Sequence, residues 1–154
     1  YGGEAGMWGA NDPDCRKPMV WDDLQYDPEF MGPDGQRVGP HEVKFDRDLH
    51  AFFKAAIALR RETPALNQGG FRWLAVDDAA DTLVMERRDG KSTAVVAFNR
   101  SEGPQTVRFE APDGWPDNAV RAAFVSDGGS VVLRRIGNEL LADLPPLTAA
   151  VFLP

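Results

Sequence analysis

The chain has 154 residues, of which 43% are hydrophobic, and its 17 basic and 24 acidic side chains give a net charge of −7. This length predicts one compact domain, or one domain with an appendage, and falls short of the roughly 200 residues that a complete (β/α)8 barrel needs. The apolar content argues against disorder, and the acidic balance argues against a nucleic-acid partner. No apolar run approaches the ~18 residues that would cross a bilayer, so we expect no membrane partner either.

The first third of the chain differs in composition from the rest. Residues 1–45 hold nine acids and four bases, are dense in glycine, proline and aspartate, and show no apolar period of 3.6 or 2 residues. We therefore predict long loops here, and loops of such length inside compact proteins are usually functional. The chain opens on Tyr1-Gly2-Gly3-Glu4, without a methionine or the features of a signal peptide, and we expect it to be a piece of a longer parent.

These predicted loops combine residue types that suit a sugar. Aromatic faces offer flat apolar surface, whereas carboxylates and a guanidinium offer paired hydrogen bonds to hydroxyl groups. The alternative that composition leaves open is an acidic, solvated loop whose tryptophans pack on a neighbouring domain. The residues concerned are Trp8, Asp12, Asp14, Arg16, Trp21, Asp22, Asp23 and Tyr26.

Residues 47–62 carry the clearest helical pattern. Apolar side chains recur there at i, i+3, i+4 and i+7, which predicts an amphipathic helix. Asp46 or Asp48 can cap its start, and Pro64 ends it. The apolar positions are Leu49, Phe52, Phe53, Ala56, Ile57 and Leu59.

From Gly70 onward the apolar period changes to two, which predicts short strands. In one of them Val107 and Phe109 should face inward. Asp89-Gly90 and Gly137-Asn138 have the composition of two-residue hairpin turns, whose central positions favour positive φ. About eight strands at this spacing predict a mainly β fold, an antiparallel β-sandwich or barrel. The predicted strands are 82–88, 93–99, 105–110, 119–125, 130–136, 139–144 and 148–153, with 71–76 as a weaker eighth.

Familiar signatures of nucleophiles, cofactors and metals are missing from the sequence. There is no G-x-S-x-G elbow or phosphate-binding P-loop, and His41 and His50 have no second cysteine to complete a zinc site, so we expect no cofactor and no metal. The lone Cys15 rules out an internal disulfide, and we predict it to be a small buried side chain. Asn99-Arg100-Ser101 fits the glycosylation pattern, which we attribute to chance.

Two segments carry a resemblance to a known family. Tyr1–Met7 (Tyr-Gly-Gly-Glu-Ala-Gly-Met) and Asn11–Trp21 (Asn-Asp-Pro-Asp-Cys-Arg-Lys-Pro-Met-Val-Trp) resemble the α-amylase family of glycoside hydrolases. The closest resemblance is to the cyclomaltodextrinase, neopullulanase, maltogenic amylase and maltodextrin glucosidase group. The resemblance is dense over residues 1–22, loosens through Leu59–Leu66, and continues only as a match of architecture.

The resemblance implies a division of the chain into two domains. Residues 1–66 would be the end of the catalytic (β/α)8 barrel, with its last strand end, loop and last helix at 47–62. Residues 67–154 would be domain C, the antiparallel β-sandwich that follows the barrel in this family.

The resemblance also implies a function for the parent protein, retaining hydrolysis of α-glucosidic bonds in maltodextrin, cyclodextrin or related oligosaccharides. The three catalytic acids of the family lie on earlier strands, before Tyr1, so we expect no catalytic residue here and no activity from the fragment itself. Asp12 and Arg16 match the pair that hydrogen-bonds a glucose unit on the non-reducing side of the cleaved bond. Trp8 and Trp21 are the further substrate-binding candidates, balanced between the cleft wall and packing.

Two rival functions stay open at this point. A free-standing carbohydrate-binding β-sandwich would present a strip of exposed aromatic side chains, for which the strand region supplies only the tryptophans Trp73 and Trp115. A non-catalytic homologue would differ only in the acids that precede Tyr1. The implied partner is an α-glucan oligosaccharide, with a homo-oligomeric parent left open, and the lone cysteine together with the resembling group favours a cytoplasmic location.

Overall fold

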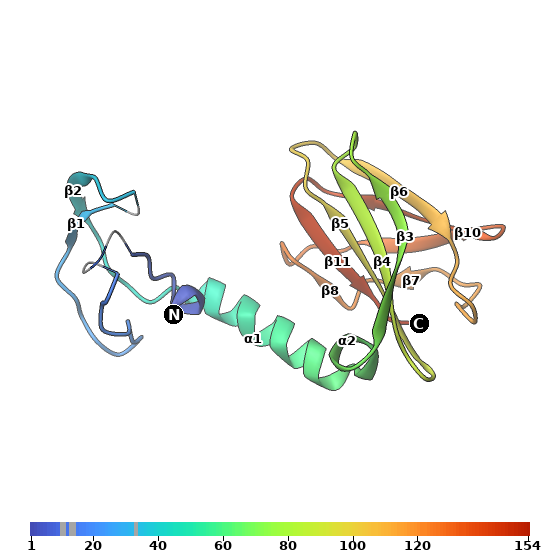
Figure 1. Cartoon of the computed structure of the whole chain (residues 1–154), viewed down its shortest axis with the longest axis horizontal. Helices are drawn as coiled ribbons and strands as arrows, with labels where there is room; N and C mark the ends of the chain where they lie inside the picture. Colours follow the sequence, from blue (N-terminus) through green and yellow to red (C-terminus); the bar gives the residue numbers. More distant parts are fainter. Residues whose placement is uncertain (10–11, 13–14, 33) are drawn as a thin grey trace. The chain divides into compact units, whose positions relative to one another are not determined.

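The computed structural model describes residues 1–9, 12, 15–32 and 34–154, and it divides into two compact units, Tyr1–Ala55 and Ala56–Pro154 (Figure 1). The second unit is built almost entirely of strands. None of the helices among the described residues is long and apolar enough to cross a membrane.

The strands of the second unit form two antiparallel sheets. One has five strands in the order β3-β4-β5-β11-β8, and the other has four in the order β6-β10-β9-β7. All their pairings are antiparallel, which confirms the predicted β-sandwich. The bounds are β3 Gly70–Asp77, β4 Thr82–Asp89, β5 Ser92–Asn99, β6 Gln105–Glu110, β7 Val120–Arg121, β8 Phe124–Val125, β9 Val132–Ile136, β10 Glu139–Leu144 and β11 Thr148–Phe152.

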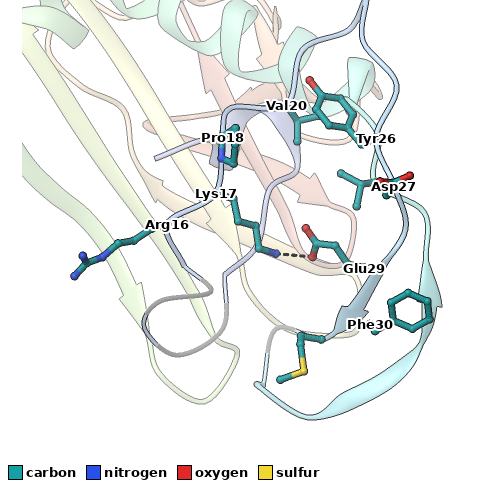
Figure 2. Close-up of a pocket in the computed structure, with 10 residues that line it drawn as sticks. Arg16, Lys17, Pro18, Val20, Tyr26, Asp27, Glu29 and Phe30 are labelled. Atoms are coloured by element: carbon teal, nitrogen blue, oxygen red, sulfur yellow. Dashed lines mark hydrogen bonds and ion pairs between the residues drawn. The ribbon is translucent and has the colours of Figure 1, made fainter.

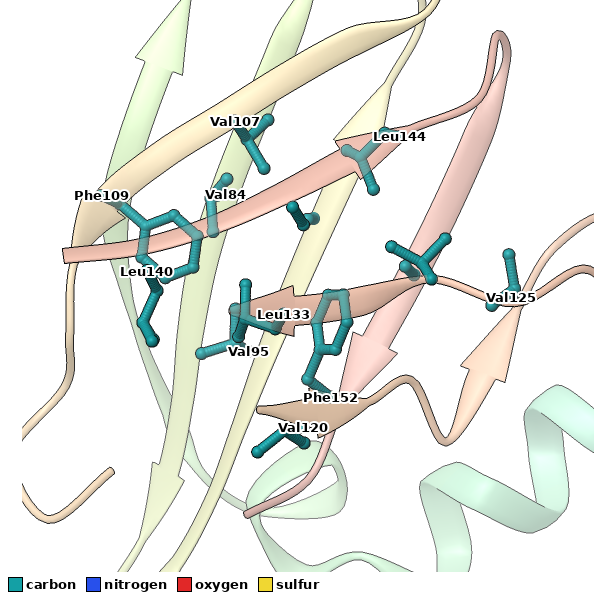
Figure 3. Packing of buried hydrophobic residues seen from close by; sticks show 14 of the residues in the cluster. Val84, Val95, Val107, Phe109, Val120, Val125, Leu133, Leu140, Leu144 and Phe152 are labelled. Carbon is teal, nitrogen blue, oxygen red and sulfur yellow. The ribbon is translucent and has the colours of Figure 1, made fainter. Parts of the chain in front are cut away.

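The main core lies between the two sheets (Figure 3). Val107 and Phe109 of β6 point into it and are 3% and 4% exposed, whereas the alternate residues of that strand face solvent, as the period of two predicts. Phe152 of β11, in the five-stranded sheet, and Leu140 of β10, in the four-stranded sheet, both lie in this core and are fully buried. Burial of this apolar surface is the main source of stability in the second unit.

A smaller cluster covers the outer face of the five-stranded sheet. Helix α2 (Pro64–Asn67) places Ala65 and Leu66 against Val96 of β5 and Val151 of β11. Strand β5 is therefore buried on both faces, which explains its continuous apolar run.

Asn99 is a buried polar side chain at the end of β5. It is 2% exposed, and its Nδ2 lies 2.8 Å from the carbonyl oxygen of Gly103, 2.8 Å from that of Pro145 and 3.2 Å from that of Leu144. Its Oδ1 accepts hydrogen bonds from the backbone N–H and the hydroxyl of Ser101. Because its nitrogen is engaged inside the fold, the match of this asparagine to a glycosylation pattern is structural coincidence.

Helix α1 spans Arg47–Glu62, as predicted. The Asp46 Oδ1 accepts a hydrogen bond of 2.9 Å from the backbone N–H of Leu49, so Asp46 is the capping residue of the two candidates. No residue of α1 is buried, and Phe53 and Ile57 on its apolar face are 38% and 53% exposed. Pro64, expected only to end this helix, also begins α2.

Two details of the β prediction are wrong. The single strand expected over 119–125 is two short strands, since β7 pairs with β9 and β8 pairs with β11 in the other sheet. The turn expected at Asp89-Gly90 lies one residue later, at Gly90-Lys91, because Asp89 still pairs with Ser92. The turn at Gly137-Asn138 is confirmed, although only its glycine has positive φ.

The first unit is less irregular than predicted. Strands β1 (Glu29–Met31) and β2 (Arg37–His41) form an antiparallel hairpin where long loops were expected, and a short 3-10 helix spans Gly3–Ala5. The prediction of a buried Cys15 is also wrong, since this side chain is exposed. Among the described residues of this unit, the buried hydrophobic side chains are Ala5 and Val20.

Candidate functional site

The best-defined candidate for binding chemistry is a pair of side chains in the first unit, Asp12 and Arg16. The Arg16 Nε lies 2.7 Å from Asp12 Oδ1, and its Nη2 donates to Oδ2 at 3.2 Å. Both nitrogens on one side of the guanidinium thus meet both carboxylate oxygens, which is the paired geometry typical of Arg–carboxylate contacts. The Arg16 side chain remains 76% exposed and that of Asp12 61% exposed, so their other hydrogen-bonding positions face solvent.

Trp8 packs against the β1–β2 hairpin. Its Nε1 donates to the carbonyl oxygen of Met31 at 3.3 Å, and its ring meets that of His41 edge to face at 6.2 Å between centroids. The Lys17 ammonium lies 5.4 Å from the centre of the same ring, within the range of a cation–π contact. These contacts give Trp8 a packing role, whatever else it does.

Trp21 presents its side chain to solvent. It is 55% exposed, and the Tyr26 hydroxyl accepts a hydrogen bond of 2.5 Å from its backbone N–H. The backbone of Trp21 is therefore held while its indole remains free to stack on a ligand.

A pocket of about 440 Å³ lies within the same unit, between the segment of Arg16–Val20 and the first strand of the hairpin (Figure 2). At its centre the Lys17 Nζ lies 2.5 Å from Glu29 Oε2, and both side chains are about three-quarters buried. The Arg16 side chain points away from this ion pair. The lining includes Pro18, Val20, Tyr26, Asp27, Phe30, Met31 and Val43.

The arrangement offers a mixed apolar and hydrogen-bonding surface. The exposed fork of Asp12 and Arg16 can accept from one hydroxyl and donate to its neighbour, and Trp21 offers an exposed ring elsewhere in the same unit. These groups suit binding and orientation of a hydroxylated ligand.

The other acidic residues that the sequence singled out include Asp22 and Asp14. Asp22 accepts a hydrogen bond of 2.6 Å from Arg47 Nε at the start of α1, and this bond together with the charge of Asp22 raises the pKa of Arg47. Asp14 lies outside the described residues. Within the part of the chain that the structure describes, no group of three or more histidine, cysteine, aspartate or glutamate side chains is arranged to hold a metal ion.

Sequence reasoning missed the Lys17–Glu29 pair. Lys17 adjoins Arg16 in a recognisable segment, but Glu29 comes from a strand that the apolar period did not predict. The only signal was the opposite charge of two residues in an otherwise acidic stretch, which does not identify partners.

Sequence comparison finds relatives over about two thirds of the chain. A cyclomaltodextrinase from Geobacillus thermopakistaniensis is 40% identical over 101 residues, which is 66% of this chain and 14% of the relative. Neopullulanase 2 from Thermoactinomyces vulgaris is 33% identical over 73% of this chain, and an intracellular maltogenic amylase from Bacillus subtilis is 32% identical over 70% of it. The chain spans only 14–16% of the length of these relatives. No family model matches the chain.

Solved structures match nearly the whole chain. An Anoxybacillus α-amylase superposes with a TM-score of 0.71 and 22% identity, covering 99% of this chain and 27% of that one. An α-amylase from Geobacillus thermoleovorans, solved in complex with acarbose, gives a TM-score of 0.68 and 25% identity, covering 99% of this chain and 28% of that one. These matches support the fold of the chain independently of the sequence relatives.

Proposed function

We propose that this chain, which is homologous to the cyclomaltodextrinase, neopullulanase and maltogenic amylase members of the α-amylase family, is part of an enzyme that hydrolyses α-glucosidic bonds in maltodextrins, cyclodextrins or related oligosaccharides. The relatives are α-glucan hydrolases by name, and the chain corresponds to 14–16% of their length. The substrate is an α-glucan oligosaccharide, in keeping with the acarbose complex of a structural neighbour.

In this proposal, residues 1–66 are the end of the catalytic barrel and residues 67–154 are domain C. The sandwich supports the second assignment, because it has its own buried core. The apolar face of α1 supports the first, since Phe53 and Ile57 are well exposed in the described chain and a barrel would cover them.

Asp12 and Arg16 are proposed to hold a glucose unit on the non-reducing side of the bond that is cleaved. The observation that carries this role is their paired contact at 2.7 and 3.2 Å, made while both side chains remain mostly exposed. Exposed ion pairs contribute little to stability, so a ligand is the stronger reason for this geometry. Trp21 would wall the cleft, and Trp8 would support the wall from the hairpin side.

The catalytic acids are proposed to lie elsewhere in the parent enzyme. A retaining glycosidase needs one carboxylate as nucleophile and a second carboxyl group as acid and then base. The residues described here would instead use binding energy to orient the reacting bond. The isolated chain is therefore expected to release no reducing sugar from maltohexaose or β-cyclodextrin, and turnover above background by pure protein would contradict this part.

The binding role is tested in the full-length parent. Asp12→Ala and Arg16→Ala should each raise KM for a maltodextrin about tenfold, corresponding to the loss of one charge-assisted contact. Arg16→Lys should restore little, because a lysine ammonium lacks the planar fork. Arg100→Ala is the matched control, since Arg100 also faces a carboxylate, Asp81 at 3.7 Å, but lies in the sandwich. Unchanged kinetics in both binding variants would remove the pair from the substrate site.

Two further properties of the parent are proposals as well. A cytoplasmic location fits a chain that has one exposed cysteine and no disulfide. A homo-oligomeric state of the parent is the second, and sedimentation of the full-length protein would decide it.

A further inference from the structure

The segment that carries the Asp12–Arg16 fork is anchored to the β1–β2 hairpin at the residue next to Arg16. The Lys17 Nζ lies 2.5 Å from Glu29 Oε2 on β1, and the Lys17 side chain is only 22% exposed and that of Glu29 24% exposed. Figure 2 shows this pair with the Arg16 side chain directed away from it. Two adjacent residues of one segment therefore divide the tasks, since Lys17 contacts the hairpin and Arg16 faces solvent.

Trp8 connects Lys17 to the hairpin a second time. The Lys17 ammonium lies 5.4 Å from the centre of the Trp8 ring, and the Trp8 Nε1 donates to the carbonyl oxygen of Met31 on β1. The Trp8 ring also meets the ring of His41 on β2, and His41 lies opposite Glu29 in the hairpin register. These contacts form a closed set, which restricts the Lys17 side chain more than any one of them would.

The backbone of Lys17 is held as well, because its carbonyl oxygen accepts a hydrogen bond from the Tyr1 hydroxyl. Consecutive Cα atoms are about 3.8 Å apart, so a fixed Lys17 leaves the backbone of Arg16 little freedom to shift. Exposed side chains change rotamer quickly, and the Arg16 side chain is 76% exposed. The position of the Asp12–Arg16 fork therefore depends on how firmly the backbone beside it is held.

The energetics of the Lys17–Glu29 pair favour an effect on geometry over an effect on stability. Removing two charges from water costs about as much free energy as their attraction returns, so a pair that is about three-quarters buried adds little net stability. Two apolar side chains of similar volume would pack against the hairpin too, but they would lack the directional contact that fixes where the segment lies.

We propose that Lys17 is a positioning residue for the Asp12–Arg16 fork, acting through its contacts with Glu29 and Trp8, and that it sets how tightly the fork holds neighbouring hydroxyls of a glucose unit. This inference rests on the proposed function, because it assigns the Lys17–Glu29 pair a part in the substrate binding proposed for the fork. Lys17 acts here through Arg16 and makes no contact with the substrate itself.

The main test is the kinetics of the full-length parent with Lys17→Met/Glu29→Met, in which neither charge is left buried without its partner. KM for a maltodextrin should rise about fivefold, because a fork that adopts its productive arrangement about a fifth of the time binds about fivefold more weakly. The kcat should stay within about twofold, as for a loss of binding alone. Lys17→Arg keeps the positive charge beside Trp8 and Glu29, so its KM should stay within about twofold of that of the unaltered enzyme.

A double-mutant cycle with Arg16→Ala shows whether the pair acts through the fork. In the Arg16→Ala background, Lys17→Met/Glu29→Met should change KM by less than about twofold, because no guanidinium is left to position. A pair that only supports the fold would raise KM by the same factor in both backgrounds, and that result would overturn the proposal.

The matched control is an exposed ion pair of the same residue types in the same unit. The Lys44 Nζ lies 2.8 Å from Glu42 Oε2, and these side chains are 72% and 73% exposed. Lys44→Met/Glu42→Met should leave KM unchanged. An equal rise in KM in this control would show that loss of any ion pair in the unit weakens binding, which would contradict a specific role for Lys17.

Nuclear relaxation of the ¹⁵N-labelled, 154-residue chain separates this inference from the proposed function. The heteronuclear NOE of the Arg16 amide and of its Nε–H should fall in Lys17→Met/Glu29→Met, whereas amides of the buried Val95 and Leu140 should keep their values and show that the sandwich is folded. An unchanged Arg16 NOE would overturn the positioning role whatever the kinetics show. A lowered NOE together with an unchanged KM in Arg16→Ala would overturn the proposed function of the fork, while the anchoring of Arg16 by Lys17 would stand.

Discussion

The two units of the chain gain their order in different ways. Among described residues, Tyr1–Ala55 buries only Ala5 and Val20 as hydrophobic side chains and relies on a hairpin, ion pairs and aromatic contacts. Ala56–Pro154 encloses a continuous apolar core between two sheets. The stability of the chain is therefore concentrated in the sandwich, whereas the polar groups of the first unit remain available to a ligand.

The largest expected effect comes from emptying the sandwich core. Phe152→Ala should lower the free energy of unfolding by about 3–5 kcal/mol, because this fully buried ring leaves a cavity that the sheets fill only in part. Phe53→Ala, on the exposed face of α1, should cost less than about 1 kcal/mol. Urea unfolding followed by circular dichroism measures both, and equal losses would erase the contrast between the units.

The next largest effect comes from removing the buried, hydrogen-bonded side chain of Asn99 in the sandwich. Asn99→Ala should cost about 2–3 kcal/mol, since the buried carbonyl oxygens of Leu144 and Pro145 lose the Asn99 amide donor, and that of Gly103 keeps only its bond from the Ser101 hydroxyl among those described. Asn118→Ala is the matched control, since the exposed amide of Asn118 donates to the carbonyl oxygen of the neighbouring Ala119. A loss below that of the control would show that water replaces the asparagine.

A smaller effect concerns acid stability. Burial alone would raise the pKa of Glu86, but the hydrogen bonds and charges of Arg72 and Arg88 outweigh it and hold this pKa below its ordinary value of 4.5. A lowered folded-state pKa means that the stabilisation is complete above the unfolded-state pKa and is lost as the pH falls through the folded-state pKa.

Glu86→Gln should therefore remove part of the pH dependence of unfolding below pH 4.5 and cost about 1–2 kcal/mol at neutral pH. Asp143→Asn is the comparison. The hydrogen bond from Thr106, with help from Arg134, lowers the pKa of Asp143 too, but this side chain is exposed and should matter less. Identical acid profiles for Glu86→Gln and the unaltered chain would contradict the role of the buried carboxylate.

The smallest effect lies at the start of α1. Asp46→Ala should lower helix stability by about 1 kcal/mol, because the N–H of Leu49 loses its cap. Asp46→Asn should keep most of that contribution, and Asp48→Ala is the control at the alternative capping candidate. Helical circular dichroism during thermal unfolding would report the change, and a larger loss in Asp48→Ala would reverse the assignment.

How far the sequence predicts this molecule depends on whether a feature is local. The bounds of α1 follow from its own apolar period, and Pro64 limits it. The single strand predicted over 119–125 failed because its two halves join different sheets, a choice made by partners far along the chain. The hairpin of β1 and β2 escaped prediction because its second strand contains glycine and proline and shows no alternation.

The candidate site divides in the same way. Asp12 and Arg16 are four residues apart, so their pairing is local, and the sequence analysis named both as candidates. The contact of Trp8 with Met31 joins residues 23 positions apart, which no local pattern specifies. The partners of Glu86 could not be predicted for the same reason. Alternation places Glu86 on the inward face of β4, but it does not show that arginine side chains bind it there.

The register of β3 shifts between Trp73 and Ala75, where an extra residue bulges from the strand. An open strand edge is a template on which a second chain can extend the sheet, and a bulge interrupts the regular row of donors and acceptors that this requires. This bulge therefore works against the assembly of the protein into continuous fibrous sheets. The edge of β3 stays open to solvent all the same.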